Sequence, residues 1–73
     1  MLPVPTGARA LMNADQAVTI LGVPGTTNKK VVIDALRRLA KEPGPAGEAA
    51  YWALNNWCQF MGEARRRGYD DRS

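Results

Sequence analysis

The chain has 73 residues, with ten Lys and Arg against seven Asp and Glu, a net charge of +3, one cysteine and no histidine. A chain of this length forms one small domain and has no room for a separate catalytic domain. It lacks the commonest general base and metal ligand, and a single cysteine allows neither an intramolecular disulfide nor a thiolate metal site. We therefore expect a non-enzymatic protein with no metal site, no cofactor and no small-molecule substrate.

The N-terminal segment does not predict export or membrane insertion. It has no basic stretch followed by a long apolar core, and no apolar run approaches the roughly 20 residues required to span a bilayer. A single cysteine also fits a reducing compartment. We expect a cytoplasmic protein with no membrane partner.

An all-α domain is predicted between two irregular ends. Pro3, Pro5 and Gly7 oppose regular structure, so residues 1–12 are expected to form an extended or mobile arm. Residues 70–73 are expected to form a flexible tail. Between them, residues 13–69 show helical periodicity and no sustained alternation of period two, which predicts a compact domain of three helices.

The first helix is predicted over residues 14–21. Asn13 can act as the N-cap, with Gln16 three positions later as in a capping box. Gly22 can end the helix, because glycine tolerates the positive φ of a C′ residue. Three apolar residues share one face and are expected to enter the core: Ala17, Ile20 and Leu21.

The turn ILGVPGTTNKK, residues 20–30, begins like a phosphate-binding P-loop. The match fails at Thr27 and Asn28, which stand where that loop has glycine and lysine, so we exclude a nucleotide site. The same turn fits a helix-hairpin-helix that holds a nucleic-acid phosphate, with Lys29 and Lys30 as counter-charges. The simpler interpretation is a helix stop followed by a Pro-Gly turn.

A second helix is predicted over residues 28–41, capped by Thr26 or Thr27 and stopped by the PGP sequence at residues 43–45. Its inner stripe is expected to contain Val32, Ala35, Leu36 and Leu39. The opposite side carries three cations and one acid, namely Lys30, Asp34, Arg37 and Lys41. This basic ridge suits either solvation or an acidic partner surface.

The third helix is predicted to begin near Ala46 or Gly47 and to end near Arg67, before Gly68. One face carries a long apolar stripe, bordered by Phe60 and Cys58: Ala50, Ala53, Leu54, Trp57, Met61 and Ala64. Cys58 is expected to be a small buried apolar residue.

Trp52 does not fit this stripe, because it lies about 140 to 160° from the centre of the stripe. An aromatic residue near arginine is typical of the centre of a protein interface, although Leu2, Val4 or Pro5 of the arm could instead cover it. The residues predicted to bind a partner are Tyr51, Trp52, Asn55, Gln59, Arg66, Lys30, Arg37 and Lys41. The cations predicted to reach nucleic acid or an acidic surface are Lys29, Lys30, Arg65, Arg66 and Arg67.

From Ile20 to Asp70 the chain resembles the J-domain of co-chaperones. The matched residues are Leu21, Gly22, Val23, Ala35, Arg38, Leu39, Ala40, Tyr69 and Asp70. The resemblance implies a short helix, a basic second helix and a final helix that ends near Arg and Tyr-Asp. The family's His-Pro-Asp tripeptide falls on Gly44, Pro45 and Ala46, so only the proline is kept and stimulation of a chaperone ATPase is not expected.

A second resemblance covers the whole chain. Its length, its Pro-rich arm and the segment YWALNNWCQF are similar to small phage-encoded regulators of host RNA polymerase, of the kind found in a Xanthomonas phage. This resemblance implies binding to host bacterial RNA polymerase, inhibition of initiation and promotion of antitermination, with nascent RNA or DNA as further contacts. The alternatives are a degenerate J-like interaction domain and a small nucleic-acid-binding domain.

Overall fold

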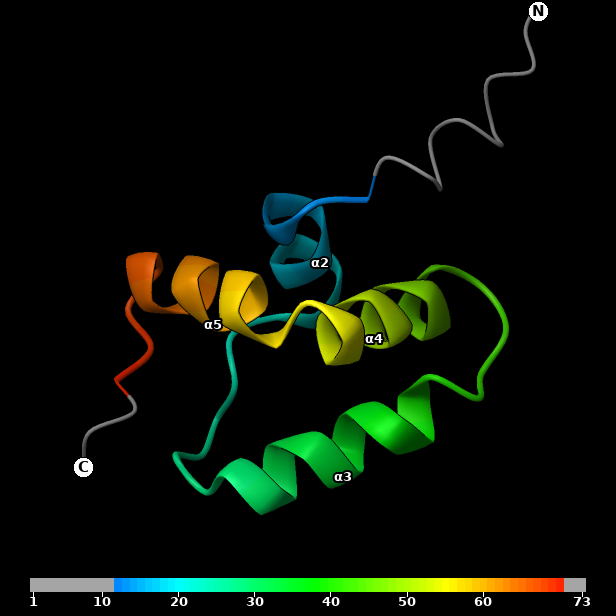
Figure 1. Ribbon diagram of the computed structural model, residues 1–73, viewed down its shortest axis with the longest axis horizontal. Helices are drawn as coiled ribbons and strands as arrows, with labels where there is room; N and C mark the ends of the chain where they lie inside the picture. Colours follow the sequence, from blue (N-terminus) through cyan, green and yellow to red (C-terminus); the bar gives the residue numbers. More distant parts are fainter. Residues whose placement is uncertain (1–11, 71–73) are drawn as a thin grey trace, which may run out of the picture.

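The computed structural model describes residues 12–70, which form four α-helices and no strand (Figure 1). The helices are α2 (Ala14–Leu21), α3 (Lys29–Leu39), α4 (Pro45–Asn55) and α5 (Trp57–Arg66). The all-α class is confirmed, but the described residues contain four helices where three were predicted. Apart from Met12 and Asp70, the expected arm and tail lie outside the described residues.

Helix α2 has the bounds predicted from its capping residues. The Asn13 side chain accepts a hydrogen bond from the Gln16 backbone N–H at 2.8 Å. Gly22 adopts a φ of 87° and donates its N–H to the Val18 carbonyl at 2.7 Å. A local cap at each end is sufficient to define this short helix.

Helix α3 begins later than predicted, because its cap is neither of the two threonines. Asn28 is the N-cap, and its side-chain oxygen accepts from the backbone N–H groups of Lys30 and Val31 at 3.0 and 3.3 Å. The Thr26 hydroxyl instead accepts from the Asn28 N–H at 3.1 Å. The threonine therefore shapes the turn before the helix, and the better capping residue starts the helix.

The predicted third helix is divided at Asn56. This residue has φ −133° and ψ 50°, outside the helical region. The Asn55 and Asn56 side-chain amides donate to the carbonyls of Tyr51 and Trp52 at 2.8 and 2.9 Å. Asparagine is a poor helix former because its side chain competes for backbone hydrogen bonds, so two in succession favour a break. The apolar periodicity continues across the break, and the prediction of one long helix from that periodicity was wrong.

Helix α4 lies at the centre of the domain and packs against α2, α3 and α5, while α2 also packs against α5 (Figure 1). Its buried face consists of small residues, namely Gly47, Ala49, Ala50 and Ala53. A Cβ atom on Gly47 would stand 1.8 Å from the Glu42 carbonyl oxygen. Only glycine therefore permits the connection between α3 and α4 to cross this helix so closely.

Three residues expected in the core lie elsewhere. Ile20 is 41% exposed, and Val18 is buried together with Ala17. Ala35 is exposed beside an open groove between α3 and residues 21–26. Cys58 is exposed, because it lies about 110° from the centre of the face that buries Phe60, Met61 and Ala64. Leu54 and Trp57 are only half-buried and pack against the core.

Gly68 ends α5 as predicted, with a φ of 111°. The N–H groups of Tyr69 and Gly68 donate to the carbonyls of Ala64 and Arg65, each at 3.0 Å, which is a Schellman motif. The buried Tyr69 ring places its hydroxyl 3.1 Å from the Thr26 carbonyl and donates to it. The end of α5 is thereby joined to the turn before α3.

Candidate functional site

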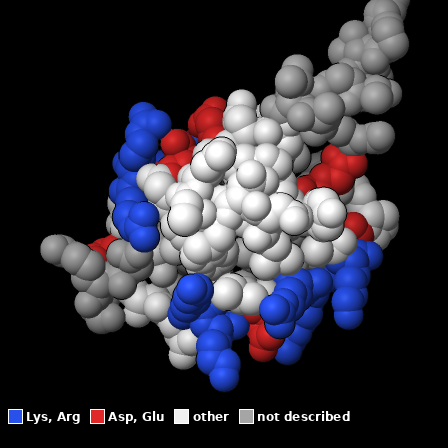
Figure 2. Space-filling view, viewed as in Figure 1, with Lys and Arg blue, Asp and Glu red and all other residues white. Residues whose placement is uncertain are grey.

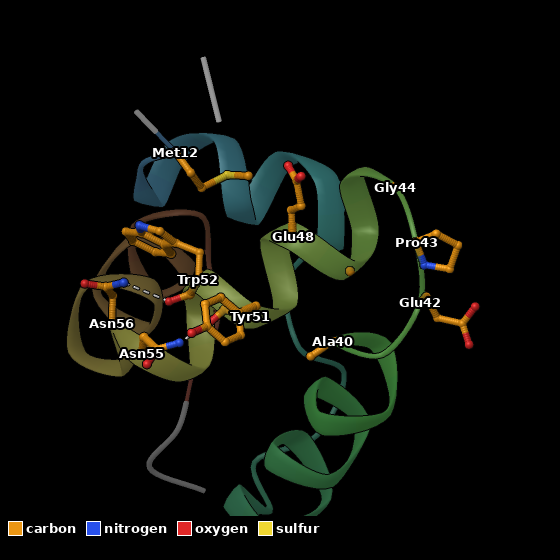
Figure 3. A pocket seen from close by; sticks show the side chains of 11 residues that line it. Met12, Ala40, Glu42, Pro43, Gly44, Glu48, Tyr51, Trp52, Asn55 and Asn56 are labelled. Atoms are coloured by element: carbon orange, nitrogen blue, oxygen red, sulfur yellow. Dashed lines mark hydrogen bonds between the residues drawn. The ribbon is translucent and has the colours of Figure 1, made fainter. Parts of the chain in front are cut away.

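A hollow of about 570 Å³ lies over the outer face of α4 (Figure 3). Met12 borders it on the α2 side, and Ala40, Glu42 and Pro43 border it on the α3 side. The remaining lining residues are Gly44, Gly47, Glu48, Tyr51, Trp52, Asn55 and Asn56. We call this hollow the Tyr51 pocket, because Tyr51 is its most exposed aromatic residue.

The two aromatic residues of the Tyr51 pocket differ in burial. Tyr51 is 65% exposed. Trp52 is half-buried and packs against the core, so it does not lie on a fully exposed face. The arm residues proposed to cover Trp52 lie outside the described residues, and Met12, the last residue of the expected arm, lines the pocket.

The charges of the Tyr51 pocket are negative. Glu42 and Glu48 are exposed at its border, and none of the described lining residues is Lys or Arg. The Asn55 and Asn56 amides are held by the α4 carbonyls and stabilise the end of that helix. An apolar hollow bordered by carboxylates suits an apolar side chain that carries, or lies beside, a positive charge.

The residues predicted to bind a partner do not form one patch. Tyr51, Trp52 and Asn55 line the Tyr51 pocket, whereas the other five lie on other elements. Gln59 and Arg66 are exposed on α5, and Arg66 pairs with Glu63 at 2.9 Å. The exposed cations of the basic ridge, Lys30, Arg37 and Lys41, lie on α3 or just after it. Figure 2 shows the basic side chains in two groups, one along α3 and one near the end of α5.

The three consecutive arginines have different surroundings. Arg67 forms an ion pair with Asp15 of α2 and another with Glu63 at 3.1 Å, so it joins the end of α5 to the start of α2. The Arg66 side chain is 78% exposed. Arg65 lines a second, smaller pocket together with Lys29 and Trp57. This second pocket brings two predicted cations from separate parts of the chain, Lys29 and Arg65, to one place.

Sequence reasoning missed most of the border of the Tyr51 pocket. The missed residues are Met12, Ala40, Glu42, Pro43, Gly44, Gly47, Glu48 and Asn56. Met12 stands directly before the N-cap, where an apolar residue often packs back onto its helix, and this signal was available. The Asn55-Asn56 pair was also visible as a helix-breaking signal. The contribution of residues 42–48 depends on the path of the α3–α4 connection, which has no local signature.

Within residues 12–70, no group of three or more His, Cys, Asp and Glu is placed to hold a metal ion. None of the helices in this part of the chain is long and apolar enough to span a membrane. No protein-family model, curated protein or solved structure matches the chain.

Proposed function

We propose that the protein is a non-enzymatic regulator that acts by binding another protein, and that this partner is the RNA polymerase of a bacterial host. In this proposal it acts in the host cytoplasm, inhibits initiation and promotes antitermination. The Tyr51 pocket supports a binding function, and the partner's identity depends on the resemblance to small phage-encoded regulators of RNA polymerase.

The observation that carries the binding function is the exposed Tyr51 ring beside a half-buried Trp52 in an open apolar hollow. A tyrosine ring buries a large area at little entropic cost, and such residues supply much of the energy of protein interfaces. Trp52 is already held by the core, so it can form a rigid floor without being ordered on binding. Tyr51 is the contact that a partner would cover.

In this proposal the acidic border of the Tyr51 pocket and the basic ridge along α3 have different functions. Glu42 and Glu48 favour a partner segment with a cationic side chain at the Tyr51 pocket. The basic ridge of Lys30, Arg37 and Lys41 increases the rate of association with the acidic surface of a large complex. Regulation would then follow from occupation of a polymerase surface that initiation or termination requires.

Purified bacterial polymerase provides the direct test. We expect the polymerase to co-elute with the wild-type protein in size-exclusion chromatography, and Tyr51→Ala to weaken the affinity by about 30-fold, equivalent to about 2 kcal/mol for a central contact. The matched control is Val31→Ala, which trims an exposed apolar residue on another helix. Absence of a complex with either core polymerase or holoenzyme would refute the polymerase proposal.

Single-round transcription separates binding from regulation. Wild-type protein should reduce initiation and increase readthrough of an intrinsic terminator, and Tyr51→Ala should require a correspondingly higher concentration for both effects. Val31→Ala should act like the wild type. If the complex forms but neither initiation nor termination changes, the proposed binding function stands and the proposed regulatory function is contradicted.

A further inference from the structure

A second pocket, of about 180 Å³, lies along α5 beside the start of α3 and includes Trp57. Its lining residues are Thr27, Lys29, Trp57, Met61, Arg65 and Tyr69. They come from the turn before α3, the first residue of α3, helix α5 and the residue that follows Gly68. None of these residues lines the Tyr51 pocket.

The aromatic platform in this pocket is held in place. Trp57 is half-buried and its ring lies 6.2 Å from the ring of Phe60, which is 1% exposed. The Lys29 ammonium stands 6.0 Å from the centroid of the Trp57 ring, within the range of a cation–π interaction. The Tyr69 hydroxyl bond to Thr26 fixes the opposite wall.

The charges of this pocket are positive, unlike those of the Tyr51 pocket. Lys29 and Arg65 both line it, and Lys30 is exposed at the next position of α3. Aromatic side chains together with cations are the combination that proteins use to bind single-stranded nucleic acid.

We propose that the Trp57 pocket binds single-stranded nucleic acid, with one base stacked on Trp57 and the adjacent phosphates contacted by Lys29 and Arg65. Any base presents a π-face, so binding would show little sequence preference. Duplexes would bind more weakly, because their bases are already stacked within the helix. This inference does not depend on the polymerase proposal, since it concerns different residues and an assay without polymerase.

A fluorescein-labelled oligouridylate of about 12 nucleotides is the probe. Two phosphate contacts to a single strand predict a salt slope of about −1.4, so the affinity of the full-length protein should fall about sevenfold between about 50 and about 200 mM salt. Fluorescence anisotropy measures both affinities.

Lys29→Gln should halve the salt slope, to about −0.7, so that the affinity falls only about 2.6-fold over the same interval. Arg38→Gln is the matched control, because Arg38 is an exposed cation on the same helix that does not line the pocket. It should keep the wild-type slope. Equal effects of the two variants would show charge-driven association without a site and would overturn the proposal.

Trp57→Leu should weaken binding about fivefold or more at both salt concentrations, because one stacked base is lost. Trp57→Phe should restore most of the affinity, since it keeps an aromatic face. Circular dichroism and thermal unfolding establish that each variant is folded. Similar affinities of the leucine and phenylalanine variants would show that stacking of a base on Trp57 does not contribute to binding.

Two further results would overturn the proposal. One is the absence of oligouridylate binding at about 50 mM salt, where phosphate contacts are strongest. The other is competition by inorganic polyphosphate that equals competition by unlabelled oligouridylate at the same phosphate concentration. The second result would identify an anion site that does not recognise bases.

Discussion

The two tryptophans are five residues apart and both are half-buried, yet their surroundings have opposite charge. Trp52, before the helix break, lies in a hollow bordered by Glu42 and Glu48. Trp57, after the break, lies in a pocket that Lys29 and Arg65 also line. The same side chain therefore faces surfaces that suit different classes of partner.

The difference arises partly from other elements of the chain. The acids near Trp52 come from the α3–α4 connection and the first turn of α4, whereas Lys29 reaches Trp57 from the start of α3. Glu42 and Lys29 belong to other elements than their tryptophans, whereas Glu48 lies one helical turn before Trp52 on α4 and Arg65 lies on α5 with Trp57. An aromatic residue thus predicts that a surface binds something, while its tertiary neighbours decide the chemistry of the ligand.

The largest expected effect concerns the support beneath Trp57. Phe60→Ala should lower the free energy of unfolding by about 4 kcal/mol, because Phe60 is one of the largest fully buried side chains and its removal leaves a cavity. A domain this small has only about 5 kcal/mol of stability to lose, so urea unfolding followed by circular dichroism should show a variant that keeps only about 1 kcal/mol and unfolds at low urea concentration. Cys58→Ala, exposed on the same helix, should change stability by less than about 0.5 kcal/mol. A loss below about 1.5 kcal/mol for Phe60→Ala would contradict the packing described.

Gly47→Ala should destabilise the domain at the Tyr51 pocket, which Gly47 and Trp52 both line. The added methyl group would meet the Glu42 carbonyl, and the required backbone shift should cost about 2 kcal/mol. Gly62→Ala is the matched control and should raise stability. A Cβ atom at Gly62 meets nothing within 4 Å, and alanine stabilises the interior of a helix such as α5 by about 0.5 to 1 kcal/mol relative to glycine. Thermal unfolding of both variants provides the measurement. Equal shifts in the same direction would show that the close approach at Gly47 is unimportant.

Asn56→Ala tests the boundary between the two tryptophans. The variant loses the bond from the Asn56 amide to the Trp52 carbonyl and should lose about 1 kcal/mol of stability, with no compensating helix propensity at a non-helical residue. Asn55→Ala removes a similar but exposed bond within α4 and gains helix propensity, so its stability should change by less than about 0.5 kcal/mol. Urea unfolding distinguishes the two. A stabilised Asn56→Ala variant would indicate that α4 and α5 join into the single predicted helix.

The smallest effect concerns the anchor of α5 to α2. Arg67→Gln should lower stability by about 0.5 to 1 kcal/mol, less at high salt, because it removes the ion pairs with Asp15 and Glu63 near the surface. Arg66→Gln removes only one highly exposed pair within α5 and should cost about 0.3 kcal/mol. Denaturation midpoints at low and high salt test this order. A reversed order would mean that the link between helices contributes nothing.

Sequence patterns predicted the local features well and the positions of side chains across elements less well. The caps at Asn13, Gly22 and Gly68 acted as expected, since each depends on a few neighbouring residues. The burial of Val18 instead of Ile20 could not be read from α2 alone, because both residues lie near one apolar face. Tyr51 and Trp52, which were predicted to bind a partner, both line the Tyr51 pocket, but its acidic border came from residues that had no motif.

The sequence alone determined the helical class, the bounds of α2 and the glycine that ends α5, because capping and φ preferences act over one turn of chain. Tertiary structure decided which face of each helix is buried and which charges surround each tryptophan. These outcomes require contacts between residues far apart in the chain, such as Lys29 with Trp57 and Arg67 with Asp15. Helical periodicity describes one helix at a time, so it contains no information about which neighbour that helix meets.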